Sequence, residues 1–460
     1  MKTTFRFRCI KLVGLGTCLC VILSLGSCKK YLDAKPDKAL VIPTTLNDLQ
    51  AILDFSSRMN EGTSYSEASA DNYYLNNDDY NTLNDDVKKV YTWENFSYSD
   101  YPNDWARVYD VIYPANIVLE GIEKITPTAQ TQVSWNNIKG SALVFRASSL
   151  LQGAFIFCKA YDEVTSDKDL GLVLRLSSDF NAPSARGSVR ETYNRIITDL
   201  KEAAPLLPST PIHVMRPSKP AAYGLLARTY LSMGKYDSCK KYADLCLQIK
   251  HDLFDFNTVS GINSASPFPL FNKEVIMVTL ITQPVYYCIS QSFTQVDSSL
   301  YNSYSDNDLR KTAFFEPSTT GHNFKGSYSG TPWELFIGIS TDEVYLMRAE
   351  CLAREGNQDA ALKDLNKLME TKWRSGLFIP LTSNSPSEAL EIILKERRKE
   401  LIFRNLRWMD VKRLNKEGRN ITLTRLISGQ KYILTPNDNR YALPLPLDII
   451  NRTGVLQNPK

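Results

Sequence analysis

The sequence predicts a mostly α-helical fold in which tetratricopeptide-like helix pairs form a scaffold and a loop-rich, irregular part lies between them. Three observations lead to this prediction. Apolar residues recur at spacings of three and four along several stretches, one helix-pair pattern occurs twice, and two long stretches without helical spacing are rich in aromatic residues. The 460 residues are 43% hydrophobic and 23% charged, which is typical of a globular protein and excludes a low-complexity chain.

Residues 1–27 have the anatomy of a secretory signal peptide. Basic residues without any acid precede an apolar run over 12–25, and small residues follow up to Cys28. At about 1.5 Å per residue the run spans about 21 Å, which is short for a hydrocarbon core of about 30 Å, so a transmembrane helix is the weaker interpretation. Residues 25–28 resemble a bacterial lipobox. We therefore expect lipidation of Cys28 and anchoring to a membrane, with ordinary secretory cleavage as the alternative.

The charge balance argues against nucleic acid as a partner. Four of the 54 basic residues lie in the signal peptide, so the rest of the chain has as many bases as its 50 acids. A chain without net positive charge lacks the general attraction to phosphate backbones.

The cysteines beyond Cys28 are widely spaced and form no CxxC pair. We expect them to be buried small side chains, rather than disulfides or a metal site. These residues are Cys158, Cys239, Cys246, Cys288 and Cys351.

Several helices can be placed from apolar spacing and from their ends. A capping box over 188–191 begins a helix that ends near Pro205, and a second over 385–388 begins one that runs to about Phe403. Another helix carries a single apolar stripe at spacings of four and three. Its residues are Leu143, Ala147, Leu150, Ala154, Phe157 and Tyr161.

One helix-pair pattern occurs near 219–250 and again near 341–372. Small residues recur where two antiparallel helices would approach, and a glycine falls between the helices, as in a tetratricopeptide unit. The corresponding residues are Tyr223, Ala227, Tyr230, Gly234, Cys239 and Cys246 in the first unit, and Tyr345, Ala349, Leu352, Gly356, Ala361 and Leu368 in the second. We expect the two pairs to belong to one helical scaffold.

Two stretches, 61–110 and 281–340, lack helical spacing and hold eleven aromatic residues each. Long loops inside a globular chain are usually functional or disordered, and aromatic content argues against disorder. Rigid rings beside Asn, Asp and Ser suit a polar ligand such as a sugar, which has an apolar face and a belt of hydroxyls. These stretches therefore predict the ligand-binding part.

The predicted ligand-binding residues combine rings with amides and one carboxylate. They are Asp71, Asn72, Tyr73, Tyr74, Trp93, Asn95, Tyr286, Tyr287 and Trp333. The alternative is that half or more of the rings fill the core, the commoner fate of large side chains. Trp105, Tyr109 and Ile112, spaced four and three apart, are assigned to a helix core.

No catalytic motif or cofactor motif is present. The three histidines, His213, His251 and His322, lie in unrelated contexts, and no phosphate-binding loop can be identified. The acids at 78–79 and 85–86 leave a glycoside hydrolase as a less favoured alternative, because nothing apolar nearby would raise the pKa of one of them. The sequence predicts a binding protein without cofactor or metal.

Motifs along nearly the whole chain resemble the SusD/RagB family. The N-terminal region, about 42–220, contributes Trp105 to Asn116, then 186–189 before a helix that ends at 204–208, and 216–222. The C-terminal region, about 270–460, contributes 345–350, 396–401, Arg407-Trp408 with Asp410, Lys412 and Arg413, then 443–446 and Asn458-Pro459. The chain differs from the family pattern at Arg404-Asn405, where an acidic residue and glycine are usual, and at Lys29-Lys30, where acids often follow the lipidated cysteine.

This resemblance implies a single domain over 28–460, with no catalysis. It implies a lipoprotein of the outer membrane that faces the cell surface and delivers oligosaccharide to a SusC-like TonB-dependent transporter. In some relatives the ligand is a peptide, which remains an alternative here. The acids and bases over 396–413, three or four apart, are expected to form ion pairs across a packed surface.

Overall fold

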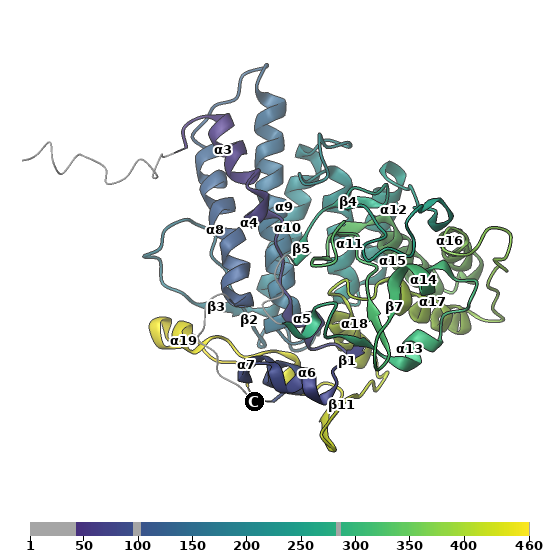
Figure 1. The fold of residues 1–460 in the computed structure, drawn as a ribbon. Coiled ribbons are helices and arrows are strands. Elements are labelled where there is room, and N and C mark those ends of the chain that lie inside the picture. Colours follow the sequence, from purple (N-terminus) through teal and green to yellow (C-terminus); the bar gives the residue numbers. More distant parts are fainter. Residues whose placement is uncertain (1–42, 95–102, 282–286, 460) are drawn as a thin grey trace, which may run out of the picture. The chain divides into compact units, whose positions relative to one another are not determined.

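A computed structural model, which describes residues 43–94, 103–281 and 287–459, confirms the mostly helical fold (Figure 1). Residues 45–460 form one compact unit with its own contacts. The signal peptide, Cys28, Asn95 and Tyr286 lie outside the described residues, and of Tyr287 only the backbone is described.

The scaffold is a series of helices that pack in chain order. Each helix contacts the next one in the series (Figure 1). Helix α12 packs directly against α15, although a loop-rich segment separates them in the sequence, and α17 contacts both α15 and α16. The helices are α8 (Asp104–Ile122), α9 (Gln132–Phe157), α10 (Val189–Leu206), α11 (Lys219–Ser232), α12 (Tyr236–Ile249), α15 (Thr341–Arg354), α16 (Gln358–Glu370) and α17 (Pro386–Glu400). Helix α9 is long and apolar enough to cross a membrane, but nearly all of its apolar window is buried, as in a core helix.

The repeat that the sequence predicts is confirmed as two helix pairs, α11 with α12 and α15 with α16. Their turns contain Gly234 and Gly356 at φ of 68° and 89°, in the left-handed region that glycine enters without a Cβ clash. Cys239 and Cys246 are fully buried on α12, and the five described cysteines are free thiols in the interior.

Shorter helices surround the scaffold. They are α3 (Leu46–Leu53), α4 (Ser56–Met59), α5 (Tyr65–Ala68), α6 (Asn77–Thr82), α7 (Asp85–Thr92), α13 (Ser298–Asn302), α14 (Leu309–Phe314), α18 (Arg407–Lys416) and α19 (Leu447–Thr453), with 3-10 turns η1 (Phe256–Thr258), η2 (Tyr287–Ile289) and η3 (Asn439–Tyr441).

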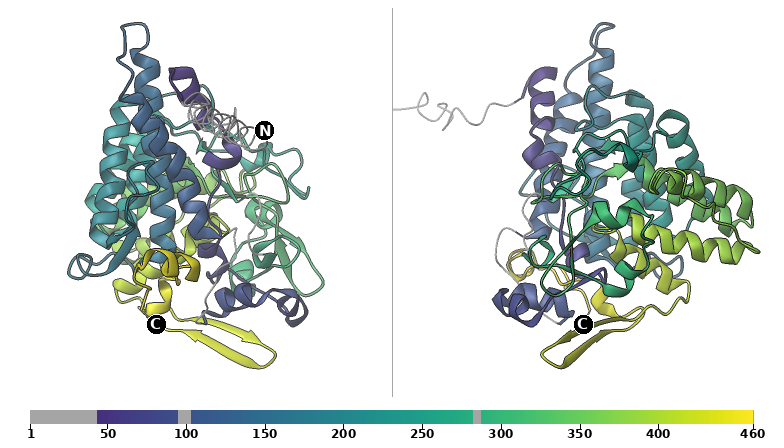
Figure 2. Two further views of the ribbon diagram at one scale, coloured as in Figure 1. Left: turned by 90° about the vertical axis from the view of Figure 1, so that its left-hand side faces the viewer. Right: turned by 45° about the vertical axis from the view of Figure 1, so that its right-hand side comes forward.

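The described strands form two-stranded antiparallel pairs. These are β1 (Tyr73–Tyr74) with β6 (Gln295–Val296), β2 (Leu170–Val173) with β3 (Arg186–Ser188), β4 (Val275–Met277) with β10 (Ile339–Ser340), β5 (Leu280–Ile281) with β9 (Leu335–Phe336), β7 (Phe315–Pro317) with β8 (His322–Phe324), and β11 (Leu423–Ile427) with β12 (Gln430–Leu434). The β1–β6 pair joins the two aromatic-rich stretches, and the β11–β12 hairpin extends away from the helices (Figure 2).

The charged segment over 396–413 forms buried ion pairs, as its spacing predicts. Glu396 accepts from Arg310, whose guanidinium is fully buried and lies 2.6 Å from the carboxylate. Arg413 pairs with Glu350 of α15 at 2.6 Å, which joins α18 to the helix-pair scaffold. Removing one partner of such a pair would leave a buried charge without compensation.

At Arg404-Asn405, where the chain departs from the family pattern, the backbone turns in the left-handed region and the basic side chain is paired. Asn405 has φ of 60°, a left-handed conformation that asparagine tolerates better than most residues. Its side-chain amide donates to the Thr63 carbonyl at 2.9 Å. Arg404 pairs with Asp342 at 3.2 Å, so the basic side chain has a buried acidic partner.

Candidate ligand-binding site

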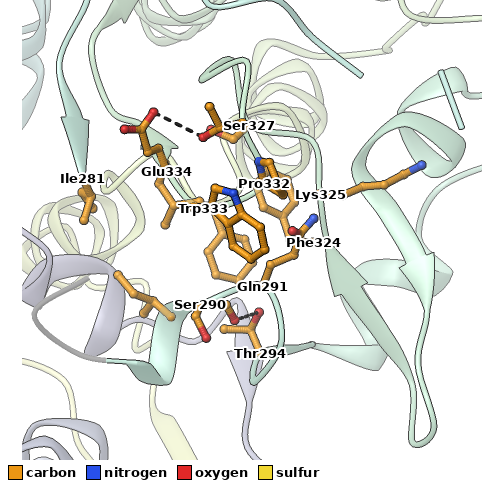
Figure 3. A pocket seen from close by; sticks show the side chains of 14 residues that line it. Ile281, Ser290, Gln291, Thr294, Phe324, Lys325, Ser327, Pro332, Trp333 and Glu334 are labelled. Atoms are coloured by element: carbon orange, nitrogen blue, oxygen red, sulfur yellow. Dashed lines mark hydrogen bonds between the residues drawn. The ribbon is translucent and has the colours of Figure 1, made fainter. Parts of the chain in front are cut away.

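A shallow depression lies beside Trp333 in the second aromatic-rich stretch (Figure 3). Its walls come from segments far apart in the chain, which the β5–β9 pair and the turn η2 bring together. The residues used below are Ser290, Gln291, Phe324, Lys325, Ser327, Thr331, Trp333, Glu334 and Phe403.

Hydrogen bonds at both ends hold the loop that carries Trp333. At its start, the Tyr328 hydroxyl donates to the buried carboxylate of Glu274 at 2.6 Å. At its end, the backbone N–H of Phe336 donates to the Ser327 hydroxyl at 2.9 Å. Between these anchors Gly330 has φ of 74°, which permits the sharp turn that reverses the loop.

Trp333 is 78% exposed, although large rings are usually buried. The depression beside it encloses only about 20 Å³, which is room for about one water molecule. A ligand bound here would lie on this surface rather than inside it. An exposed indole of this kind presents a flat apolar face to whatever covers it.

Polar groups surround the indole, and the described lining offers no free cation. Ser290, Gln291 and Thr331 provide hydroxyl and amide groups, and the Glu334 carboxylate accepts from the Thr331 hydroxyl at 3.3 Å. Lys325 points away from the ring, and its ammonium donates to the carbonyls of Ile262 and Ser264 (Figure 3). Burial lowers the pKa of Lys325.

A column of rings supports the floor of the depression. Phe324 stacks on Phe403, with ring centroids 4.7 Å apart and planes 20° apart. Beneath it, Phe403 lies 5.9 Å from Tyr73, which connects the depression to the first aromatic-rich stretch. The sequence did not predict Phe403 and Phe324 as site residues, because no local pattern around either residue indicates a ligand-binding surface.

The prediction that Tyr73 and Trp93 bind ligand is wrong, because both rings are 1% exposed. They pack around the guanidinium of Arg425, which lies 4.9 Å from the Tyr73 ring centroid and 5.2 Å from that of Trp93. The indole N–H of Trp93 donates to the Ser69 carbonyl at 2.9 Å, and the Tyr73 hydroxyl donates to that of Ala68 at 2.7 Å. Core filling, the alternative that the sequence left open, applies to these rings.

Asp71 and Asn72 are also engaged by the protein itself. Asp71 forms a two-pronged ion pair with Arg407, at 2.6 and 2.9 Å. Burial alone would raise the pKa of Asp71, but Arg407 and Arg398 outweigh burial and hold this pKa well below its ordinary value. Asn72 is buried and accepts from Arg398 at 3.1 Å. These contacts with Arg398 and Arg407 anchor α17 and α18, and the ligand role of Asp71 and Asn72 stays a prediction.

Tyr74 is half-buried, and its hydroxyl donates to the Thr320 carbonyl at 3.3 Å. This hydrogen bond ties β1 to the loop before β8. Tyr74 does not belong to the lining of the depression beside Trp333. Trp333 is therefore the one predicted site residue, among those whose side chains the structure describes, that lines the depression.

The acids considered for hydrolysis occupy the first turns of two short helices. Asp78 and Asp79 lie at the start of α6, and Asp85 and Asp86 at the start of α7. Negative side chains are stabilised there by the helix dipole, which gives these acids a structural role.

Family models match both parts of the chain. A model described as starch-binding and associating with the outer membrane matches residues 30–231, and one of the SusD family matches residues 341–459. A tetratricopeptide-repeat model matches residues 220–252, which cover α11 from its second residue and all of α12. SusD-like protein P2 of Formosa agariphila is 24% identical over 332 residues, 58% of this chain, and the match spans 64% of that relative's length.

Solved structures share the fold over nearly all of the chain. A SusD superfamily protein from Bacteroides thetaiotaomicron has a TM-score of 0.75 at 20% identity, covering 90% of this chain and 100% of that one. A putative sugar binding protein from Bacteroides vulgatus has a TM-score of 0.73 at 21% identity, covering 91% and 99%. A SusD-like carbohydrate binding protein from the same species has a TM-score of 0.66 at 18% identity, covering 89% and 97%. With the family models at both ends and this shared fold, the chain belongs to the SusD/RagB family.

Proposed function

We propose that this chain is a non-catalytic surface lipoprotein that binds oligosaccharide beside Trp333 and delivers it to a partner TonB-dependent transporter. The observation that carries the proposal is the 78% exposed indole on an anchored loop, with hydroxyl, amide and carboxylate groups around it. A sugar ring can place its C–H face on the indole while its hydroxyls exchange hydrogen bonds with these groups.

The names of the structural neighbours support a carbohydrate ligand. Two of the solved relatives are described as sugar or carbohydrate binding. The shallow form of the depression also suits a chain of sugar units lying along the surface, because an enclosed pocket would accept only a terminal unit.

Attachment and delivery are the further parts of the proposal. Cleavage after residue 27 would leave Cys28 as the lipid anchor of a single domain over 28–460, facing the cell surface at the outer membrane. The family membership supports this location and a SusC-like transporter as the partner.

A ligand screen followed by one substitution tests the proposal. The purified full-length chain is heated with oligosaccharides of different composition and with peptides, and the unfolding temperature is recorded, because a ligand that binds the folded state raises it. We expect stabilisation by an oligosaccharide. Trp333→Ala should then weaken that oligosaccharide about tenfold or more, as truncation of an aromatic contact at the centre of an interface does.

Phe271→Ala is the matched control, because Phe271 is also an exposed ring, at 54%, but lies outside the depression. It should leave the affinity unchanged. Stabilisation by peptides alone would favour the peptide-uptake alternative. Turnover of the oligosaccharide by the wild type, lost in Asp79→Asn, would contradict the absence of catalysis.

A further inference from the structure

A second, larger cavity lies beside α8, between this helix, the segment 173–184 and α19. It has a volume of about 460 Å³, within the range of about 300 to 1,000 Å³ that small-molecule sites occupy. Trp105 and Ile112 are buried in α8, as their spacing predicts, but this helix also lines the cavity. None of the cavity's lining residues belongs to the depression beside Trp333.

Buried polar contacts hold the wall of this cavity in place. Asn116 of α8 donates to the carbonyls of Arg175 and Ser177 at 3.0 and 3.2 Å. Its own amide oxygen accepts from Arg146, whose guanidinium forms a buried ion pair with Asp199. The segment is therefore tied to both α9 and α10, and the cavity is a built feature of the scaffold.

The interior is mainly aromatic. Trp105, Tyr109 and Tyr113 lie at spacings of four on one face of α8 and line the cavity. Phe180 reaches across from the opposite segment, with its ring centroid 4.6 Å from that of Tyr113. Phe180 is 73% exposed, so the cavity opens to solvent beside a ring. Such walls suit a flat apolar group rather than a fully hydroxylated one.

The charged groups in the lining are mostly acidic. Asp110, Asp179 and Asp448 are the acids, and Arg175 is the base. The Arg175 guanidinium donates to the Ala182 carbonyl at 2.6 Å and to the Ser184 hydroxyl at 2.6 Å, so it is engaged by its own loop. Asp448 is half-buried in the first turn of α19, and its carboxylate adds to the negative charge of the lining. This excess of acidic groups favours a ligand that carries a positive charge.

We propose that this cavity is a second binding site, for a small aromatic amine. The ring would lie among Tyr109, Tyr113 and Phe180, and its ammonium group would be attracted by the ring faces and by the acidic lining, which includes Asp448. The acidic lining disfavours an anion of the same size. This site is separate from the surface proposed for oligosaccharide, so either proposal can fail without the other.

Calorimetric titration of the purified full-length chain tests the site. The probes are tryptamine, its anionic counterpart indole-3-propionate, the neutral 3-methylindole, and glucose. We expect tryptamine to bind about tenfold or more tightly than indole-3-propionate, because only the cation complements the lining. Asp448→Asn should weaken tryptamine about tenfold and leave 3-methylindole unchanged, which separates loss of charge from loss of fold.

Phe180→Ala should weaken the binding of both tryptamine and 3-methylindole, because it removes an aromatic wall of the cavity that is exposed to solvent. Phe271→Ala, an exposed ring away from the cavity, is the control and should change neither affinity. Absence of tryptamine binding would overturn the proposal. So would equal binding of the anion, preferential binding of glucose, or tryptamine binding that neither Asp448→Asn nor Phe180→Ala reduces.

Discussion

The two aromatic-rich stretches both bury most of their described rings, but they differ in one exposed ring, Trp333. In 61–110, Tyr73 and Trp93 are 1% exposed and belong to the interior. In 281–340, Trp333 is 78% exposed on an anchored loop. Aromatic content therefore identified the loop-rich part of the fold, but burial decided which rings a ligand can reach.

A single buried guanidinium accounts for much of this difference. Arg425 lies on the inward-facing side of β11, where alternate residues are buried. Its guanidinium donates to the backbone carbonyls of Ala70, Tyr73 and Tyr91. The central guanidinium carbon, Cζ, lies 4.1 Å from the Tyr91 ring centroid. The first stretch thus closes around a cation from the C-terminal region. Trp333 has no cation–π contact of this kind among the described residues.

Replacing that guanidinium should have the largest effect on stability. Arg425→Met leaves three buried carbonyls without their donor, and we expect the free energy of unfolding to fall by about 3 to 5 kcal/mol. Denaturant titration measures the change. Arg58→Met removes an exposed arginine near Phe55 and should cost less than about 0.5 kcal/mol. Equal effects of the two variants would show that Arg425 does not organise the first stretch.

The next effect is on the pH dependence of stability, through Glu67 in α5. Burial raises the pKa of Glu67 to about 7, although the backbone N–H of Asn405 donates to its carboxylate at 2.8 Å. The pKa of Glu67 in the folded protein exceeds the ordinary value of 4.5. The protonated Glu67 carboxyl therefore contributes fully to the stability of the fold below about pH 4.5, and this contribution is lost as the pH rises through about 7. Relative to Glu67→Gln, the wild type should lose roughly 3 kcal/mol over this window.

The two pH profiles are compared by denaturant titration at each pH. Parallel profiles for the wild type and Glu67→Gln would mean that the carboxyl titrates normally. In that case the interior of the first stretch would be more accessible to water than its burial indicates.

A smaller effect is expected from the Tyr73 hydroxyl. Tyr73→Phe keeps the buried ring and removes the hydrogen bond to the Ala68 carbonyl, so unfolding should become easier by about 1 kcal/mol. The affinity for oligosaccharide should not change, because the ring and its contact with Phe403 remain. A large loss of affinity with little loss of stability would return Tyr73 to the ligand site.

The helical scaffold was predictable because its signals are local. Small residues at fixed spacing around Gly234 and Gly356 predicted two helix pairs, and capping residues predicted the starts of α10 and α17. At Asn405 the residue type differs from the family pattern, and the asparagine adopts a left-handed backbone that this residue tolerates better than most. Local backbone requirements such as these are visible in a single sequence.

The site was only partly predictable, because burial depends on partners far along the chain. Trp93 and Trp333 are each followed by glutamate and lie in similar polar surroundings in the sequence. Their exposure differs because Arg425 packs against the first stretch. Arg425 lies more than 300 residues along the chain from Tyr91, whose carbonyl it contacts. No periodic pattern links such residues, and the cavity beside α19 gave no sequence signal for the same reason.

The central claim is that the second aromatic-rich stretch binds ligand while the first supports it. Calorimetric titration of Trp333→Ala and Trp93→Phe with the stabilising oligosaccharide tests this claim most directly. We expect Trp333→Ala to weaken binding about tenfold or more, and Trp93→Phe to leave it within about twofold of the wild type. Normal affinity in Trp333→Ala together with a large loss in Trp93→Phe would contradict it.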